Sequence, residues 1–328
     1  MIDSTTGPRP ESRARLRILV LAEEAAGAQV LRMIAGRGHV VVAVMTSGAA
    51  RPDSPSPVRD LAERLGCPCW PAEGVRERGF SERVRAADVD LLVNVHSLYL
   101  IPGALLNASR LGGYNMHPGP LPEYAGRNPV SWALFRGETT HAVTIHRMVP
   151  EVDAGPIAYQ ASFDIEERDS ALTVSVKCVQ AGVPLITRLV DTAATNPAAI
   201  PAIGQDRSRR SYYGRDVPQG GQLIWPRPAR DVVNFTRACD YVPFRSPWGH
   251  PVGRVDGRQV AVVKATRTGV RCAAPPGAVS DVVGGAVRVA CADEWVLVHR
   301  VLTDGQLVYA SRTLRPGQQF ETENGGRE

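Results

Sequence analysis

Short apolar runs alternate with helical patterns over the first half of the chain. The first apolar run, Arg17–Ala22, is followed by a helical pattern over 26–36 and a second apolar run over 40–46. The alternation continues with a helical pattern at 58–65 and an apolar run at 90–95. Strands that are apolar on both faces and separated by helices are typical of a parallel sheet covered on both sides. The pattern predicts a doubly wound α/β domain with a mostly parallel sheet.

The pattern changes near residue 200. Pro197 and Pro201 precede a polar, basic stretch at 205–210, which is typical of an exposed linker. A helical pattern at 229–239 then leads into short β-rich runs that Gly and Pro interrupt at hairpin-like spacing. These runs predict a smaller β-barrel of the OB-like kind. The predicted layout is a disordered lead at 1–14, an α/β domain at 15–204, a linker at 205–221, a β-rich domain at 222–320 and a disordered tail at 321–328.

Composition narrows the class of protein. The 328 residues, 44% of them hydrophobic, are enough for two domains with cores of their own. No run approaches the roughly 18 apolar residues of a membrane helix, and residues 1–15 lack an apolar signal core. Cys67 and Cys69 are too close for the usual CxxC spacing, which favours reduced thiols in a cytoplasmic protein. The net charge of +5 suits a polyanionic substrate and is also common in proteins that bind no nucleic acid.

The segment after the first predicted strand argues against two nucleotide-binding classes. It contains Glu23 and Glu24 where a dinucleotide pyrophosphate would need glycines and free backbone N–H groups. No Gly-x-Gly-x-x-Gly follows this strand, and the chain has no Gly-Lys-Ser/Thr of a P-loop. A nicotinamide dehydrogenase is therefore disfavoured and a P-loop kinase is excluded.

Three polar side chains are expected to meet beside one strand end. Asn115 and His117 alternate along an extended segment and therefore face the same side, and three prolines directly after them end the strand. Asp153 lies in a loop just before another predicted strand, with Gly155 allowing a tight turn. An amide, an imidazole and a carboxylate together are suited to stabilising an oxyanion and transferring a proton. A zinc site is not expected, since His117 and Asp153 offer only two ligands.

The order of motifs around these residues resembles the 10-formyltetrahydrofolate-dependent formyltransferases. The matching elements are Asn-x-His, a Pro-rich loop to Tyr-x-Gly, Trp-Ala-Leu, Gly-Glu, Val-Thr-x-His-x-Met and Asp-x-Gly-x-Ile, all between residues 113 and 157. The family includes methionyl-tRNA formyltransferase, nucleotide-sugar formyltransferases and enzymes that formylate amino-acid amines. The resemblance covers about residues 15–195, and the C-terminal part resembles the small open barrel of several members.

The resemblance implies a role for each matching position. Asn115 and His117 are expected to hydrogen-bond the formyl oxygen, while Asp153 holds His117 in a useful protonation state and helps to remove the amine proton. The pterin of 10-formyltetrahydrofolate is expected against the residues Leu98, Leu100, Ile101, Glu151 and Val152. Candidates for the acceptor side are Tyr124, Arg127 and Trp132, with core packing an equal alternative for Trp132. His146 is expected to be a packed structural histidine, with a part in catalysis as the less favoured alternative.

Three functions remain open on the sequence. The leading one is formylation of a small-molecule amine, derived from an amino acid or an amino sugar. The second is methionyl-tRNA formyltransferase, which Ala125 disfavours because tRNA-directed members often have arginine in this Tyr-x-Gly loop. Arg127 is a candidate to replace that arginine in part. The third is a folate or nucleotide binder without catalysis, which has no need of all three residues of the trio.

Overall fold

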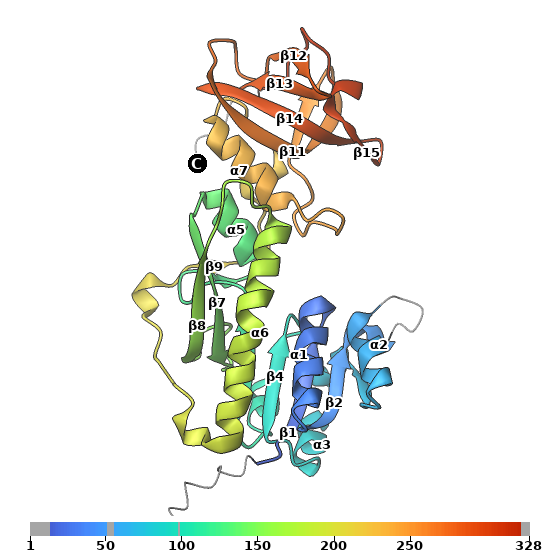
Figure 1. Cartoon of the computed structure of the whole chain (residues 1–328), viewed down its shortest axis with the longest axis vertical. Coiled ribbons are helices and arrows are strands. Elements are labelled where there is room, and N and C mark those ends of the chain that lie inside the picture. Colours follow the sequence, from blue (N-terminus) through green and yellow to red (C-terminus); the bar gives the residue numbers. More distant parts are fainter. Residues whose placement is uncertain (1–13, 51–55, 98, 323–328) are drawn as a thin grey trace, which may run out of the picture. The chain divides into compact units, whose positions relative to one another are not determined.

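The larger sheet has seven strands in the order β3-β2-β1-β4-β5-β7-β8 (Figure 1). The computed structural model describes residues 14–50, 56–97 and 99–322. Five strands from β3 to β5 pair in parallel, and β7 runs antiparallel to β5. The prediction of a mostly parallel α/β sheet is therefore confirmed. The strands are β1 (Arg17–Ala22), β2 (Val40–Thr46), β3 (Cys69–Pro71), β4 (Leu91–Val95), β5 (Gly113–His117), β7 (Thr140–Arg147) and β8 (Ile157–Asp164).

Helices cover both faces of this sheet because its central strands are apolar on both faces. Ile18 and Val20 of β1 belong to a core shared with α1, α2 and α6, whereas Leu19 and Leu21 belong to a core shared with α3 and α4. All four side chains are fully buried. The sheet is therefore doubly wound, as its apolar runs predict. The helices are α1 (Glu24–Gly36), α2 (Pro57–Arg64), α3 (Phe80–Ala86), α4 (Gly103–Leu106) and α6 (Ala171–Thr195).

The C-terminal β-rich region forms a second, antiparallel sheet. Its strand order is β10-β11-β14-β13-β12. The first half of β14 pairs with β13, and its last residues, 300–303, pair with β15. The strand β11 (Arg258–Arg271) pairs with β14 along most of its length, from Ala261 to Arg271, although the side chains of its last residues are mostly exposed. The other strands are β10 (Val252–Val255), β12 (Val279–Val283), β13 (Ala286–Ala290), β14 (Glu294–Thr303) and β15 (Gln306–Tyr309).

Helix α7 (Ala229–Cys239) packs against β11 and against α5 (Pro129–Arg136). Phe135 and Phe235 meet edge to face between the two helices, with ring centroids 5.2 Å apart. The short strands β6 (Ala125–Gly126) and β9 (Tyr212–Tyr213) form a two-stranded sheet of their own. None of the helices within the described ranges is long and apolar enough to cross a membrane.

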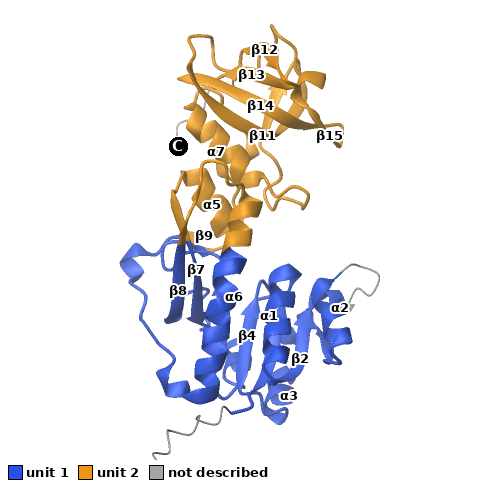
Figure 2. Cartoon of the chain, viewed as in Figure 1, with its two compact units in different colours: residues 1–125, 142–162, 178–211 blue, residues 126–141, 163–177, 212–328 orange. Residues whose placement is uncertain are grey.

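The chain divides into two compact units, coloured in Figure 2. Each unit is built from several stretches of sequence, because α5 and the first turns of α6 group with the C-terminal sheet. The linear boundaries at 204 and 222 therefore stay a prediction. Unit 1 comprises residues 1–125, 142–162 and 178–211, and unit 2 comprises residues 126–141, 163–177 and 212–328.

Helix α6 packs closely on β5 and β7 at Gly182. A Cβ atom there would lie 2.5 Å from the sulfur of Met116 and 3.0 Å from Val143 Cγ2. We expect Gly182→Leu to lower the free energy of unfolding by about 1–3 kcal/mol, because the buried space must open. The matched change Gly36→Leu, on a helical glycine with nothing near its Cβ position, should not destabilise the protein. Urea denaturation measures both, and equal effects would contradict this packing.

Candidate functional site

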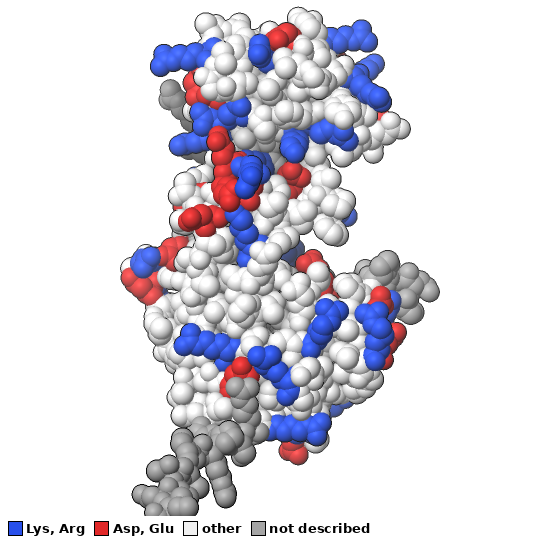
Figure 3. Space-filling view, viewed as in Figure 1, with Lys and Arg blue, Asp and Glu red and all other residues white. Residues whose placement is uncertain are grey.

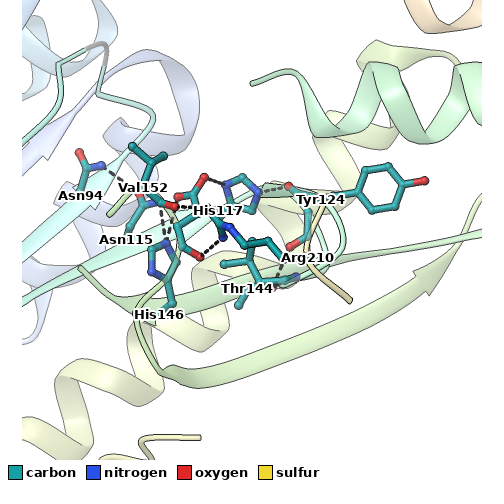
Figure 4. A network of polar contacts seen from close by, with 12 residues as sticks. Asn94, Asn115, His117, Tyr124, Thr144, His146, Val152 and Arg210 are labelled. Atoms are coloured by element: carbon teal, nitrogen blue, oxygen red, sulfur yellow. Dashed lines mark hydrogen bonds and ion pairs between the residues drawn. The ribbon is translucent and has the colours of Figure 1, made fainter. Parts of the chain in front are cut away.

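Three neighbouring strands bring an asparagine pair and a histidine together at the end of the parallel sheet. Asn94 on β4 is directly opposite Asn115 on β5, and Asn115 is directly opposite His146 on β7. Asn94 Nδ2 donates to Asn115 Oδ1 at 2.9 Å, and Asn115 Nδ2 lies 3.1 Å from His146 Nε2 (Figure 4). The register thus places these three polar side chains side by side across β4, β5 and β7.

His117 lies two residues farther along β5, opposite Thr144 on β7. The Thr144 hydroxyl donates to the Gly119 carbonyl at 2.7 Å and accepts from Leu121 N–H at 3.3 Å. Gln160 Nε2 donates to the same hydroxyl at 2.8 Å. These bonds hold the proline-rich loop that follows His117. The loop returns the Tyr124 carbonyl to within 2.6 Å of His117 Nε2.

The turn after β7 places Asp153 against both histidines. Its Oδ2 lies 3.5 Å from His117 Nδ1, and its Oδ1 lies 3.3 Å from His146 Nε2. Asp153 has φ of 52°, a left-handed conformation that costs a non-glycine residue about 1–2 kcal/mol. Gly155 is required two residues later, since a Cβ atom there would lie 1.8 Å from the Arg147 carbonyl oxygen. The expected meeting of Asn115, His117 and Asp153 is present in the structure.

The hydrogen bond to Tyr124 determines which nitrogen of His117 is free to react. Because a carbonyl only accepts, Nε2 carries the proton, and in the neutral ring Nδ1 is the basic nitrogen that faces Asp153. Burial lowers the pKa of His117, and the negative charge of Asp153 opposes that shift without cancelling it. His117 is therefore neutral at rest and has a carboxylate ready to stabilise its charged form.

The described residues among those expected to bind the pterin lie in two loops. Leu100 is 71% exposed and Ile101 is partly buried, both in the loop after β4, while Leu98 lies outside the described residues. Glu151 is exposed and paired with Arg207. The Val152 carbonyl accepts from Arg210 Nη2 at 2.6 Å. The assignment of these residues to the pterin stays a prediction.

The three acceptor candidates are in different surroundings. Tyr124 is buried in unit 1 and contacts His117 through its main chain. Arg127 is exposed in unit 2, and its N–H donates to the Tyr213 carbonyl. Trp132 stacks on Tyr213 with ring centroids 4.8 Å apart and meets Trp248 edge to face at 5.0 Å. Trp132 therefore packs in an aromatic cluster of unit 2. Core packing was the alternative to an acceptor role that the sequence left open for this residue.

Three residues of the network, Asn94, Gln205 and Arg210, were not expected from the sequence, whereas His146 was expected mainly as a structural histidine. His146 is buried at the site and touches both Asn115 and Asp153, in addition to packing in the core. Asn94 is a buried polar residue within an otherwise apolar strand, and that anomaly is visible in the sequence. Gln205 and Arg210 hydrogen-bond the turn of Asp153 from the segment expected to be a linker. Nothing in their local sequence signals this contact.

The arrangement has the parts needed for acyl transfer. Asn115 carries an amide donor, His117 has a basic nitrogen, and Asp153 is a carboxylate that is only 9% exposed. Asn94 Oδ1 is buried and has no hydrogen-bond partner among the described residues, so it is available to an N–H group of a ligand. Within the same residues, no group of three His, Cys, Asp or Glu side chains could hold a metal ion.

Comparison with known proteins places this site in a family. The Formyl transferase family model matches residues 16–190, and the model of the Formyl transferase C-terminal domain matches residues 217–315. Among solved structures, the sugar 3N-formyl transferase WlaRD, in the presence of dTDP and 5-N-formyl-THF, is similar with a TM-score of 0.67 at 14% identity. That match covers 89% of this chain and 99% of WlaRD.

Two further structures share the fold. The N-formyltransferase from Helicobacter canadensis, in complex with folinic acid and dTDP-3-aminofucose, has a TM-score of 0.66 at 15% identity, covering 86% of this chain and 98% of that one. HypX from Aquifex aeolicus, in complex with tetrahydrofolic acid, has a TM-score of 0.59 at 18% identity, covering 92% of this chain and 47% of HypX. The two family models span most of the residues that build both units, and the chain belongs to the formyl transferase family.

Proposed function

We propose that the protein transfers the formyl group of 10-formyltetrahydrofolate to the amine of a small-molecule acceptor. The observation that carries this proposal is the buried Asp153 carboxylate between His117 and His146, with Asn115 beside them. The donor supplies a formyl carbon attached to N10. WlaRD, the Helicobacter canadensis enzyme and HypX were each solved with a folate, which supports this choice of donor.

Asn115 and His117 divide the chemistry between them. When the amine attacks the formyl carbon, the carbonyl oxygen gains negative charge. Asn115 Nδ2 has two N–H bonds and only one of them faces His146, so the other can donate to this oxygen. The attacking nitrogen loses its proton to His117 Nδ1, and the resulting Nδ1–H can also donate to the oxyanion, as the family resemblance implies.

Asp153 makes this proton transfer favourable. The imidazolium that forms carries its new proton on the side facing the carboxylate, where the opposite charge stabilises it. When the bond from carbon to N10 breaks, the proton passes from His117 to N10 and leaves tetrahydrofolate. The products are the formamide and tetrahydrofolate, and His117 returns to its neutral state.

The acceptor proposal rests on charge and on the structural neighbours. Ala125 stands where tRNA-directed members often have arginine. On the face shown in Figure 3, basic side chains form separate groups interrupted by acidic and uncharged ones, and not a continuous stripe. WlaRD is described as a sugar formyltransferase, and the Helicobacter canadensis enzyme was solved with dTDP-3-aminofucose. Nucleotide-linked amino sugars and amino-acid-derived amines are therefore the first acceptors to test.

Substitutions in the trio test the catalytic roles. We expect Asn115→Ala to lower kcat about a hundredfold or more, because one oxyanion donor contributes about 3 kcal/mol. His117→Ala and Asp153→Asn should abolish turnover while folate binding survives, since both act on the transition state. Formyl transfer assays and calorimetric folate titrations measure the two effects. His299→Gln, whose imidazole contacts Thr266 in unit 2, is the matched control with unchanged turnover. Near-normal turnover of any of the three trio variants would refute the role assigned to that residue.

The neutral resting state of His117 predicts an acid-sensitive fold. Its folded pKa is lowered, so just below the ordinary value near 6.5 the unfolded chain binds a proton that the folded chain does not. The free energy of unfolding should therefore fall as pH drops below about 6.5, by at most about 1.4 kcal/mol per pH unit from this group.

Urea denaturation between pH 7.5 and 5.5 tests this sign. His117→Gln removes the titrating group and keeps an amide that can donate to Tyr124. The decline in stability should be smaller in this variant than in the wild type. An equal or larger decline in His117→Gln would mean that His117 is already charged in the folded protein.

Salt dependence separates a small acceptor from tRNA. Binding that neutralises several phosphates weakens steeply with salt, with a slope of about −0.7 to −0.9 per phosphate in log units. We expect a shallow slope with the preferred small amine and poor formylation of initiator tRNA. Both acceptors are assayed side by side over a salt series. Efficient tRNA formylation with a steep slope would reverse the ranking in favour of methionyl-tRNA formyltransferase.

A further inference from the structure

Two side chains from the segment after α6 hold the backbone of the Asp153 turn. Gln205 Nε2 donates to the Asp153 carbonyl at 2.9 Å and to the Gly155 carbonyl at 2.6 Å. Arg210 Nη2 donates to the Val152 carbonyl at 2.6 Å, and its Nη1 lies 3.3 Å from the Asp153 carbonyl (Figure 4). Side chains 50 or more residues away in sequence thus bind three backbone carbonyls of this turn, those of Val152, Asp153 and Gly155.

This turn needs external support because its conformation is unfavourable. Asp153 is in the left-handed region, and Gly155 lies directly against the Arg147 carbonyl. A residue in such a conformation persists only when its surroundings fix it. The two contacts of the carboxylate, at 3.3 and 3.5 Å, leave little room for movement, and a misplacement of about 1 Å can cost a hundredfold in rate.

Arg210 is directed at the backbone although an acid is nearby. Its side chain is only 14% exposed, and the closest approach of Glu151 to it is 3.8 Å. Glu151 is instead bound by Arg207, with both carboxylate oxygens within 2.7 Å of Nη2. A guanidinium donates through several N–H bonds in a fixed plane, so it can hold two successive carbonyls at once. Arg210 therefore fixes the direction of the peptide groups that lead into and out of Asp153.

We propose that Gln205 and Arg210 are positioning residues that keep the Asp153 carboxylate aligned with His117 and His146. The inference rests on the proposed catalytic role of Asp153. It assigns a function in the formyl transfer reaction to the segment whose composition resembles a plain linker. Neither side chain is required to touch a substrate, since both act through the backbone of the turn.

The first test compares arginines of one segment. We expect Arg210→Ala to lower kcat about 10- to 100-fold, and Arg210→Lys to retain a larger share of kcat because lysine keeps the charge without the planar fork. Gln205→Glu should also lose kcat, because it keeps the size but loses the N–H donors. The matched control is Arg209→Ala. Arg209 is 65% exposed and paired with Glu123, so its removal should leave kcat within about twofold.

Chemical rescue separates positioning from general stability. Guanidinium ion in the tens of millimolar should restore part of the kcat of Arg210→Ala, and it should not restore Asp153→Asn. The melting temperature of each variant is measured under the same conditions. A loss of kcat that follows the loss of folded protein, with no recovery by lysine or guanidinium, would overturn the inference.

The outcome also separates this inference from the proposed function. If Asp153→Asn keeps near-normal turnover, the proposed function fails together with the inference. If Asp153→Asn is inactive while Arg210→Ala and Gln205→Glu keep kcat within about twofold, only the positioning role fails. Loss of kcat in Arg210→Ala and in Gln205→Glu, with rescue of Arg210→Ala by guanidinium, supports the proposed function and the positioning role.

Discussion

A carboxylate buried beside two histidines is the constraint on which the rest of this site depends. Removing a charge from water costs several kcal/mol unless partners replace the lost solvation. Asp153 faces His117 at 3.5 Å and His146 at 3.3 Å, on adjacent strands of one sheet, and in the proposed reaction the proton that His117 takes up supplies the opposite charge. The antiparallel placement of β7 against β5 is therefore what allows one acid to face both rings. The loop held by Thr144 and the turn at Gly155 complete the same arrangement.

Much of the fold was predictable because the burial of a strand follows from the apolar residues within that strand. The continuous apolar run of Arg17–Ala22 predicts a strand covered on both faces, and the structure confirms it. Asn115 and His117 were expected on one side of an extended segment, and they lie on β5. Asp153 was found through the order of motifs and the turn that Gly155 allows, both of which are readable within a few dozen residues.

The other features of the site could not be predicted, because they depend on contacts between residues that are distant in sequence. The role of His146 follows from the pairing of β5 with β7, and strand register cannot be read from either strand alone. Gln205 and Arg210 lie in a polar, basic stretch with no apolar period, so their sequence indicates exposure. Arg207 and Arg209 in the same stretch are indeed exposed, as its polar composition predicts. The same composition gives no sign that the side chains of Gln205 and Arg210 bind the Asp153 turn.

The contact between His117 and residue 124 has a consequence for how such proteins diverge. The imidazole is oriented by a main-chain carbonyl, and every amino acid has one. A replacement of the Tyr124 side chain that preserves the loop would leave the proton-accepting nitrogen of His117 where it is. In the proposed mechanism, a substitution at residue 124 can therefore change which acceptor fits beside this loop while the base, His117 Nδ1, keeps its position.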